Sequence, residues 1–328
     1  MKKFFYICAL AAIAATALSC TKETQVAPVK MKTVSVELGA PRYAETENNL
    51  DSKTYLNGTE VWWGSNDKNI VAITDGKKGE NWFLFTSDEE TAKPTKSFHG
   101  DIPEGQTIVL FAFLCNRTSN FGLSKYTGWT TIRNILGNAQ GLNMAGSFNS
   151  QYNFAVAKPE DLYFRNCHGY LKFTDATGLI KKVKAETVGK EMLMNGSNEE
   201  EHREYMAGYF DCTYGEYDDD PTTVKSALNT GSTVNARSPY VEGTVSSPKV
   251  DETASYYLIV LPRTYHGIKL TITLTDGTAL AIKSTKEFTV PRGTAVDLGT
   301  LPVAALSKAA GSFTLEGSGD FAEGWTLE

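Results

Sequence analysis

The sequence predicts an all-β protein built from two antiparallel β-sandwich domains in tandem. Short runs rich in β-branched and aromatic residues recur along the chain, and turn signals such as Asn57-Gly58 and Asp276-Gly277 separate them. No long segment has the 3.6-residue period of an amphipathic helix. Strands at this spacing are typical of sandwiches, so we expect sheets that pack face to face.

Two of these runs, residues 107–114 and 256–261, are apolar on both alternations. A strand that buries only one face would alternate apolar and polar residues. We therefore expect both runs to be central strands with both faces covered.

The N-terminus has the pattern of a bacterial lipoprotein signal peptide. Met1-Lys2-Lys3 is basic, residues 4–18 are apolar, and Cys20 follows the small residue Ser19. Cleavage would leave the Cys20 thiol as the site of lipidation, so residues 1–19 are the signal peptide and residues 20–31 a lipidated tether. The alternative is plain secretion with a free Cys20.

Composition excludes several classes of protein. The chain has 328 residues, enough for two domains, and a formal net charge of −6 without a basic patch. This charge argues against nucleic acid as a partner. Besides Cys20, the mature chain keeps Cys115, Cys167 and Cys212 in no metal-binding spacing, so a disulfide framework is not expected. We expect Cys115 and Cys167 to be core residues.

The first hairpin is predicted around Asn57-Gly58, which suits a two-residue type I′ turn. This turn places Leu56 opposite Thr59. Trp63 and Leu56 are then expected to pack inward, with Tyr55 and Trp62 on the outer edge.

A second hairpin is predicted at Asp276-Gly277-Thr278. Leu280 and Ile282 share a face with Leu274 and Ile272 only if the loop has three residues, so this register places Leu274 opposite Leu280. Gly277 is expected to be left-handed.

Two segments, residues 116–157 and 189–250, are polar and poor in strand signals. A short helix is predicted near 131–136, and residues 196–206 are expected to form a helical turn or to be mobile. Pro159 follows the first of these segments and disfavours continued regular structure. We therefore predict domains at residues 32–158 and 159–305, followed by tail strands at residues 306–328.

Catalytic and metal-binding motifs are not found. The sequence contains no nucleophile elbow, phosphate loop or HExxH pattern, and its four histidines are scattered. No enzyme activity, cofactor or metal is expected. Aromatic residues lie among carboxylates in residues 204–220, which suits sugar binding, and the alternative is a loop whose aromatics cover the sandwich. The candidate ligand residues are Tyr205, Tyr209, Tyr214 and Tyr217.

An ordered set of segments resembles the fimbrillin family, the major- and minor-fimbria-like lipoproteins of Bacteroidetes. Besides the lipidation signal at Cys20, the segments are SKTYLNGTEVWWGSNDKNIVAI (52–73), NFAVAKPEDLYFRNCHGYLKFT (153–174), YYLIVLPRTYHGIKLTITLTDG (256–277), KEFTVPRGTAVDLGTL (286–301) and the terminal GWTLE. The resemblance covers nearly the whole chain except residues 189–250. It implies two transthyretin-like β-sandwich domains and a lipid anchor in the outer membrane at the cell surface.

The resemblance also implies a function as a fimbrial (pilus) subunit or fimbria-like adhesin. In polymerising members a trypsin-like protease cuts after a basic residue, the first strand leaves, and a strand of another subunit fills the groove. Here that strand would be residues 33–38, with Val34, Val36 and Leu38 alternating inward. Arg42 is the first choice for the cut and Lys53 the second, and residues 312–328 would donate the strand.

The partners implied are other fimbrial subunits, the outer membrane, and a host or bacterial glycan or protein. Two alternatives remain open at this point. Residues 33–38 could be a permanent edge strand, and the chain could be an unpolymerised surface lipoprotein that binds glycan.

Overall fold

The computed structural model describes residues 29–38, 55–57, 60–75, 82–113, 122–126, 129–143, 145–149, 152–160, 162, 164–195, 198–213, 237–250, 252–301, 303, 312–313 and 324–327. Apart from isolated helical residues such as Val303, the regular elements of these ranges are all strands, so the predicted all-β class is confirmed. Among these residues, no helix has the length and apolar character needed to cross a bilayer.

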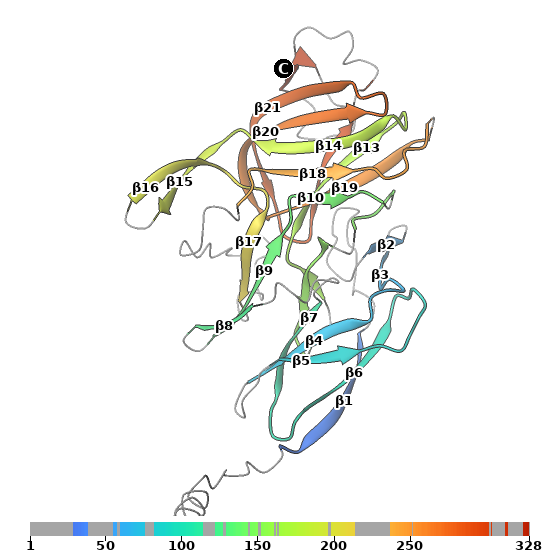
Figure 1. Ribbon diagram of the computed structural model, residues 1–328, viewed down its shortest axis with the longest axis vertical. Coiled ribbons are helices and arrows are strands. Elements are labelled where there is room, and N and C mark those ends of the chain that lie inside the picture. The colour runs from blue at the N-terminus through green and yellow to red at the C-terminus, as the bar shows by residue number, and fades with distance from the viewer. Residues whose placement is uncertain are drawn as a thin grey trace, which may run out of the picture.

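The first sheet has seven antiparallel strands and occupies the lower end of the molecule in Figure 1. In spatial order they are β1 (Met31–Leu38), β6 (Lys96–Pro103), β5 (Trp82–Thr86), β4 (Asn69–Thr74), β7 (Ile108–Phe113), β11 (Ala155–Ala157) and β12 (Arg165–Asn166). β7 lies between β4 and β11, and its apolar residues are buried on both faces, as its sequence predicts.

Trp63 organises the core on one face of this sheet. Its ring is fully buried and meets Phe98, Phe113 and Phe164 edge to face, with ring centroids 5.2, 5.6 and 5.3 Å away. Edge-to-face aromatic pairs add stabilisation beyond the area that they bury. The prediction that Trp63 packs inward is confirmed. Trp62 is half-buried.

Two further sheets lie above the first in Figure 1, and all of their strands except β10 come from the second half of the chain. One has seven strands: β10 (Ala139–Gly141), β18 (Tyr240–Thr244), β14 (Ile180–Thr187), β20 (Arg263–Leu274), β21 (Ala279–Val290), β24 (Trp325–Leu327) and β23 (Ser312–Phe313). The other has three: β19 (Ala254–Val260), β13 (Gly169–Asp175) and β22 (Ala295–Thr300). β10 runs parallel to β18, and β22 runs parallel to β13, so these sheets are mixed.

The run at residues 256–261 differs from its prediction. β19 is buried along most of its length, but it is the outer strand of its sheet rather than a central one. Its free edge is covered by the Gln140 side chain, whose Nε2 donates to the Ile259 carbonyl at 2.6 Å while its Oε1 accepts from the Ile259 N–H at 2.9 Å. At Ile259 a single side-chain amide therefore takes the place of a neighbouring strand.

Three small sheets complete the described structure. They are formed by β2 (Tyr55–Asn57) with β3 (Glu60–Trp62), by β15 (Lys190–Asn195) with β16 (Asn198–Arg203), and by β17 (Gly208–Thr213), β9 (Trp129–Leu136) and β8 (Gly122–Tyr126). The predicted helix near 131–136 is wrong, because β9 occupies it. The expectation of a helical turn or mobile segment at 196–206 is also wrong, because β16 pairs along its length with β15.

Both predicted hairpins are present, each in a register displaced by two residues. Asn57 pairs with Glu60, which places Leu56 opposite Val61 instead of Thr59. Ile272 pairs with Leu280, so the three-residue loop is 275–277. Gly277 is left-handed as predicted, with φ of 88°. It ends this loop, where a three-residue hairpin requires a left-handed residue.

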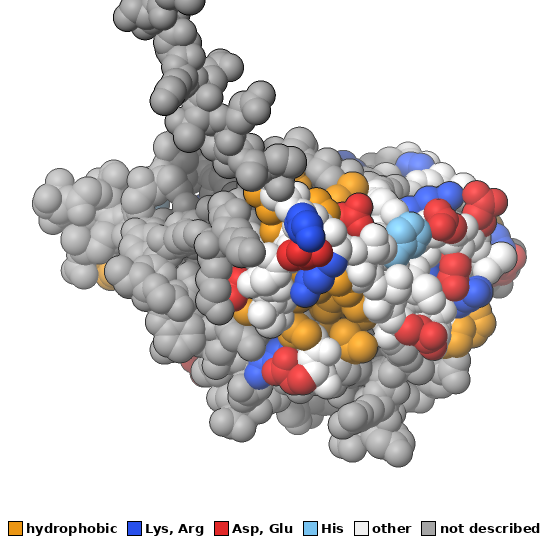
Figure 2. Space-filling view, turned by 90° about the horizontal axis from the view of Figure 1, so that it is seen from below, with side chains coloured by type: hydrophobic (Ala, Val, Ile, Leu, Met, Phe, Trp, Pro, Cys, Tyr) orange, Lys and Arg blue, Asp and Glu red, His pale blue; other side chains and the backbone are white. Residues whose placement is uncertain are grey.

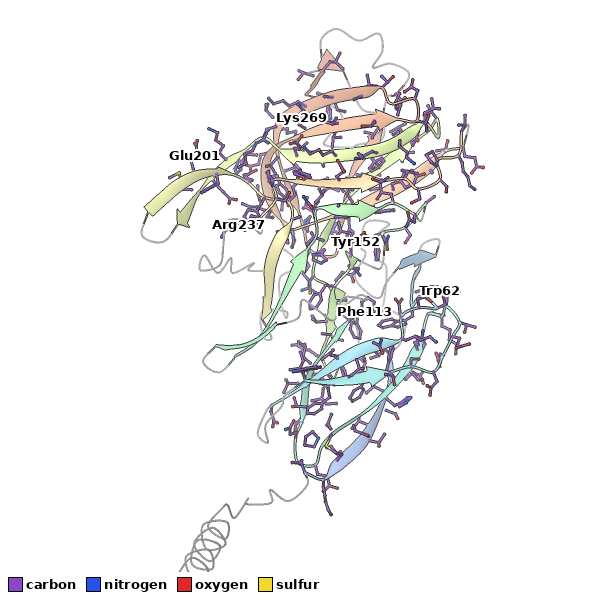
Figure 3. The ribbon with its side chains drawn as sticks, in the orientation of Figure 1. Trp62, Phe113, Tyr152, Glu201, Arg237 and Lys269 are labelled. Carbon is purple, nitrogen blue, oxygen red and sulfur yellow. The ribbon has the colours of Figure 1, made fainter. Side chains whose placement is uncertain are left out.

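The first sheet is not separate from the second half of the chain. Val71, Ile73, Leu110 and Ala112 belong to the same hydrophobic cluster as the interior of the later sheets. The junction also holds a buried polar network. In it Tyr170 Oη donates to Asn153 Oδ1, and Asn153 Nδ2 donates to Asn166 Oδ1, both at 2.8 Å. Tyr152 lies at this level of the molecule in Figure 3.

Candidate functional site

β1, the strand predicted to be exchanged, lies at the edge of the first sheet. It pairs with β6 through eight residues, from Met31 opposite Pro103 to Leu38 opposite Lys96. Leu38 is buried, while Val34 and Val36 are half-buried and pack against the cluster around Trp63. The three residues named from the sequence therefore share one face and contact the core, and the residues between them are exposed.

β1 and β6 form a two-stranded ribbon at this edge. The ladder between β6 and β5 has one residue pair, Thr86 with His99, whereas β1 follows β6 over its full length. Thr33 Oγ1 also donates to Asp101 Oδ1 at 2.6 Å. Loss of β1 would leave most of β6 without a backbone partner, and an unpaired strand edge is prone to associate with another chain.

A buried cation lies at the end of this ribbon. Lys96, opposite Leu38, is fully buried, and its Nζ donates to the Gly64 carbonyl at 3.1 Å. Burial lowers the pKa of Lys96, and the nearby carboxylates of Asp67 and Glu89 oppose that shift. The lysine thus ties the last residue pair of the ribbon to the turn that follows Trp63.

The surface at this end of the molecule is mixed in character. Seen from below in Figure 2, hydrophobic side chains are interspersed with acidic and basic ones. The exposed hydrophobic residues of this sheet include Trp82 and Leu84, which alternate on β5, and Met31 at the start of β1.

The tail strands, β24 and β23, lie at one edge of the other seven-stranded sheet. β24 pairs with β21 through three residues, from Ile282 opposite Leu327 to Ser284 opposite Trp325, and β23 pairs with β24 in turn. Trp325 is fully buried in the main core, so one aromatic side chain anchors a short ladder. In Figure 1 the C-terminus is at the upper end and β1 at the lower end of the longest axis.

Tyr205, predicted to belong to a ligand surface, is only 2% exposed. The guanidinium of Arg263 lies 4.8 Å from the centre of its ring, and that of Arg237 lies 5.4 Å away. Burial raises the pKa of Tyr205 to about 12. The ring therefore belongs to the interior and is not open to a ligand, which corrects its assignment. Tyr205 faces inward because the chain returns from β16 to the body of the sheets at this point.

The remaining predicted site residues lie wholly or partly outside the described part of the structure. Tyr209 lies in β17, but its side chain is outside the described part of the structure. Cys20, Arg42, Lys53, Tyr214 and Tyr217 lie outside the described residues.

One charged cluster was not predicted. Glu204 has a side chain only 2% exposed, and it accepts hydrogen bonds from the backbone N–H of His266 at 3.0 Å and from His266 Nδ1. His266 Nε2 lies 2.9 Å from Glu287 Oε2. The hydrogen bond and the charge of Glu204 raise the pKa of His266. Glu204 and His266 are 62 residues apart, so no local motif could have indicated this contact.

The cluster fixes the base of the β15–β16 hairpin, which projects from the body of the sheets in Figure 1. Beside it Arg263 binds Glu191 of β15, with Nη2 2.7 Å from Oε2. Glu201 of β16 and Arg237 are labelled in Figure 3. Within the described ranges, no group of three or more histidine, cysteine or acidic residues is placed to bind a metal ion.

Comparisons with known proteins found one distant structural neighbour. No protein-family model matches the chain, and no curated protein matches it. A crystal structure of a proposed cell adhesion protein from Bacteroides fragilis aligns with a TM-score of 0.30 and 8% sequence identity, over 70% of this chain and 76% of that one.

Proposed function

We propose that this protein is a fimbrial subunit or fimbria-like adhesin that assembles by protease-triggered strand exchange. The chain would be exported as a lipoprotein, lipidated at Cys20 and anchored in the outer membrane at the cell surface. Its sheets would correspond to two transthyretin-like sandwiches. Cleavage at Arg42, or at Lys53 as second choice, would release β1.

The observation that carries this proposal is the position of β1. A strand at a sheet edge can leave without breaking a second ladder, and among the described strands β1 pairs with β6 alone. Its departure would uncover both a row of backbone groups and the pockets of Val34, Val36 and Leu38. A donated strand with the same alternation would satisfy both.

The placement of the two edges supports a head-to-tail polymer. β1 and the tail strands lie at opposite ends of the longest axis. A contact between two different surfaces of one protein builds an open filament when the rotation does not close. The tail would have to detach from β21 to act as donor, which breaks three residue pairs and exposes Trp325. We therefore expect the tail to exchange only when an open acceptor groove is available.

Limited trypsin digestion of the full mature chain tests the proposal. The expected result is one early cut near Arg42, followed by a ladder of species that resist SDS without heating. The Arg42→Ala variant should lose both the cut and the ladder, unless trypsin turns to Lys53. Lys68→Ala, at an exposed lysine of the same half, is the matched control and should behave like the unmodified chain.

Removal of the tail separates the two steps of the scheme. A chain that ends before residue 312 should still be cut but should form no ladder. The proposal fails if the chain loses β1 and remains monomeric, or if it resists trypsin altogether; the second result favours an unpolymerised surface lipoprotein.

A further inference from the structure

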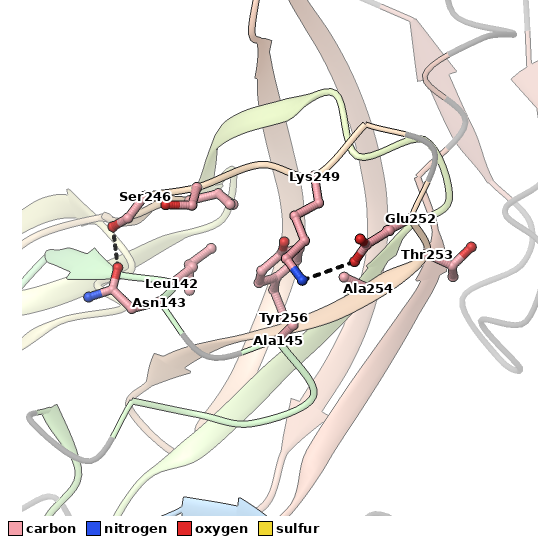
Figure 4. A pocket seen from close by; sticks show the side chains of 11 residues that line it. Leu142, Asn143, Ala145, Ser246, Lys249, Glu252, Thr253, Ala254 and Tyr256 are labelled. Atoms are coloured by element: carbon pink, nitrogen blue, oxygen red, sulfur yellow. Dashed lines mark hydrogen bonds and ion pairs between the residues drawn. The ribbon is translucent and has the colours of Figure 1, made fainter.

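A cavity of about 440 Å³ lies beside β18 and β19. Three stretches of chain line it: the segment after β10, the segment after β18, and the segment leading into β19. Figure 4 shows these walls with their side chains. The volume falls within the range of roughly 300–1,000 Å³ that is usual for small-molecule sites.

Backbone hydrogen bonds hold the walls in place. The Leu142 N–H donates to the Thr244 carbonyl at 2.8 Å, and the Gly146 N–H donates to the Ser255 carbonyl at 2.7 Å. Between these two bonds, the Ser246 hydroxyl and the Asn143 side-chain oxygen form a hydrogen bond that joins two walls. A site held in this way is largely preformed, which lowers the entropy cost of binding.

The wall formed by the segment after β18 rests on a turn built by Asp175. Its buried carboxylate accepts from the backbone N–H groups of Thr177 at 2.9 Å, Gly178 at 3.0 Å and Ile180 at 3.0 Å. Gly178 is left-handed, and a Cβ there would lie 1.6 Å from the Lys249 carbonyl oxygen. The turn therefore presses against the segment that carries Lys249 and fixes its path.

The polar side chains among the lining residues carry no surplus charge. Ser246, Ser247 and Thr253 offer hydroxyls, each able to donate and to accept. Lys249 Nζ lies 3.2 Å from Glu252 Oε2, and these side chains are 71% and 61% exposed, so the pair balances itself at the rim. Such an exposed pair is weak and can open to bond a ligand at little cost.

An aromatic residue forms part of the lining. The Tyr256 ring is mostly buried and stacks at a tilt on Phe173, with ring centroids 5.7 Å apart. Burial, Asp175 and Glu252 together raise the pKa of Tyr256. Its hydroxyl is protonated at neutral pH, as in any ordinary tyrosine, and can donate. The same two carboxylates disfavour an anionic ligand.

We propose that this cavity binds a neutral saccharide. Hydroxyls, an amide and a balanced ion pair match the alternating donors and acceptors of a sugar ring, and small apolar residues such as Ala145 and Ala254 can contact its C–H face. A phosphate or a nucleotide would meet one cation that is already paired. Hydrogen bonds that replace water contribute modestly, so we expect a Kd on the order of 1 mM for one site.

Many copies of this protein displayed side by side would bind a saccharide surface with a higher effective affinity than one copy, without new contacts at each site. The site itself does not depend on strand exchange, and its test uses the uncut monomer. A negative result here therefore leaves the polymerisation proposal intact, and the reverse also holds.

Ligand-observed NMR on the full mature chain tests the site. The neutral probes are lactose, maltotriose and N,N′-diacetylchitobiose, and the acidic probes are 3′-sialyllactose and galactose 6-sulfate. We expect at least one neutral probe to bind more tightly than the acidic ones. Ala145→Trp places a large ring on an exposed wall position and should weaken binding at least about tenfold.

Ala279→Trp is the matched control, because Ala279 is also exposed but does not line the cavity. It should leave the Kd within about twofold. If Ala145→Trp fails to fold, Ser246→Ala removes one wall contact instead and should weaken binding by roughly threefold to tenfold. The proposal is overturned if no neutral probe binds at about 10 mM, tenfold above the expected Kd. Unchanged binding in both wall variants, or a preference for the acidic probes, would overturn it as well.

Discussion

The β1 edge of the first sheet and the tail-strand side of the other seven-stranded sheet are held in opposite ways. β1 is joined to β6 by a ladder of eight residue pairs, but two of its three inward side chains are only half-buried. β24 is joined to β21 by three pairs, and the fully buried Trp325 supplies its anchor. The first edge relies mainly on backbone hydrogen bonds, and the second relies mainly on one aromatic side chain.

This difference decides what each edge responds to. A backbone ladder is indifferent to most side-chain changes but is lost when the chain is cut and the strand diffuses away. An edge held by one buried side chain is unaffected by cuts elsewhere in the chain but is weakened when that side chain is truncated. We therefore expect proteolysis to act on the β1 edge and side-chain truncation to act on the β24 edge.

The largest expected effect comes from the core beneath β1. Trp63→Ala should lower the free energy of unfolding by about 3–5 kcal/mol, because it empties the space between Phe98, Phe113 and Phe164. Chemical denaturation measures this loss. Trp62→Ala at the half-buried neighbour is the control and should cost clearly less. A loss below about 1 kcal/mol for Trp63→Ala would place that ring outside the folded core.

Truncating the two edge anchors compares the edges directly. Trp325→Ala should cost about 3 kcal/mol and should speed amide hydrogen exchange in β24, with β1 unaffected. Leu38→Ala should cost about 2 kcal/mol and speed exchange in β1 and β6 together, because the two strands form one ribbon. Faster exchange in β1 after Trp325→Ala would show that the edges are coupled, contrary to this comparison.

A smaller effect is the pH dependence of stability that comes from a buried histidine, His168, near the junction. Burial lowers the pKa of His168 to about 3, so the unfolded chain binds a proton more readily below pH 6.5. Stability is therefore lost as pH falls, by about 2 kcal/mol between pH 6.5 and pH 5. Urea unfolding across this range measures the slope, which should flatten in the His168→Gln variant. An equal slope in that variant would contradict the assignment.

The smallest effect has the opposite sign. The pKa of His266 is raised by Glu204, so its contribution is complete below pH 6.5 and is lost as pH rises through the raised value. The ring is 59% exposed, and solvent screening keeps this contribution below that of His168. Thermal melts at pH 6 and pH 8.5 should be run in the His168→Gln background, where adding His266→Asn should reduce the loss of stability at the higher pH. If the chain that carries only His168→Gln is more stable at pH 8.5 than at pH 6, the sign is wrong.

The two hairpins show what sequence patterns can determine about a sheet. In both, the pairing differs from the prediction by two residues, because alternation fixes register only to the nearest even number. Which of the registers that remain is adopted depends on side-chain pairing and on the needs of the turn. At β2 and β3 the adopted register pairs Leu56 with Val61, and at β20 and β21 it puts Gly277 where the loop needs a left-handed residue.

Pairing between polar strands could not be predicted from either strand alone. Asn198–Arg203 has no apolar alternation, and it is a strand because β15 supplies both its ladder and the cation that binds Glu201, with Lys190 Nζ at 2.6 Å. The Glu204–His266 contact and the burial of Tyr205 escaped prediction for a related reason. Each depends on which distant segment returns to cover the residue, and a single sequence does not record that.

The Gln140 amide has a practical consequence for dissecting this molecule. β10 lies before Pro159, yet it pairs with β18, and Gln140 covers the edge of β19. A fragment begun at residue 159 would lack this strand and leave the edges of β18 and β19 bare, inviting aggregation during expression. Truncations meant to isolate the C-terminal half should start upstream of Ala139.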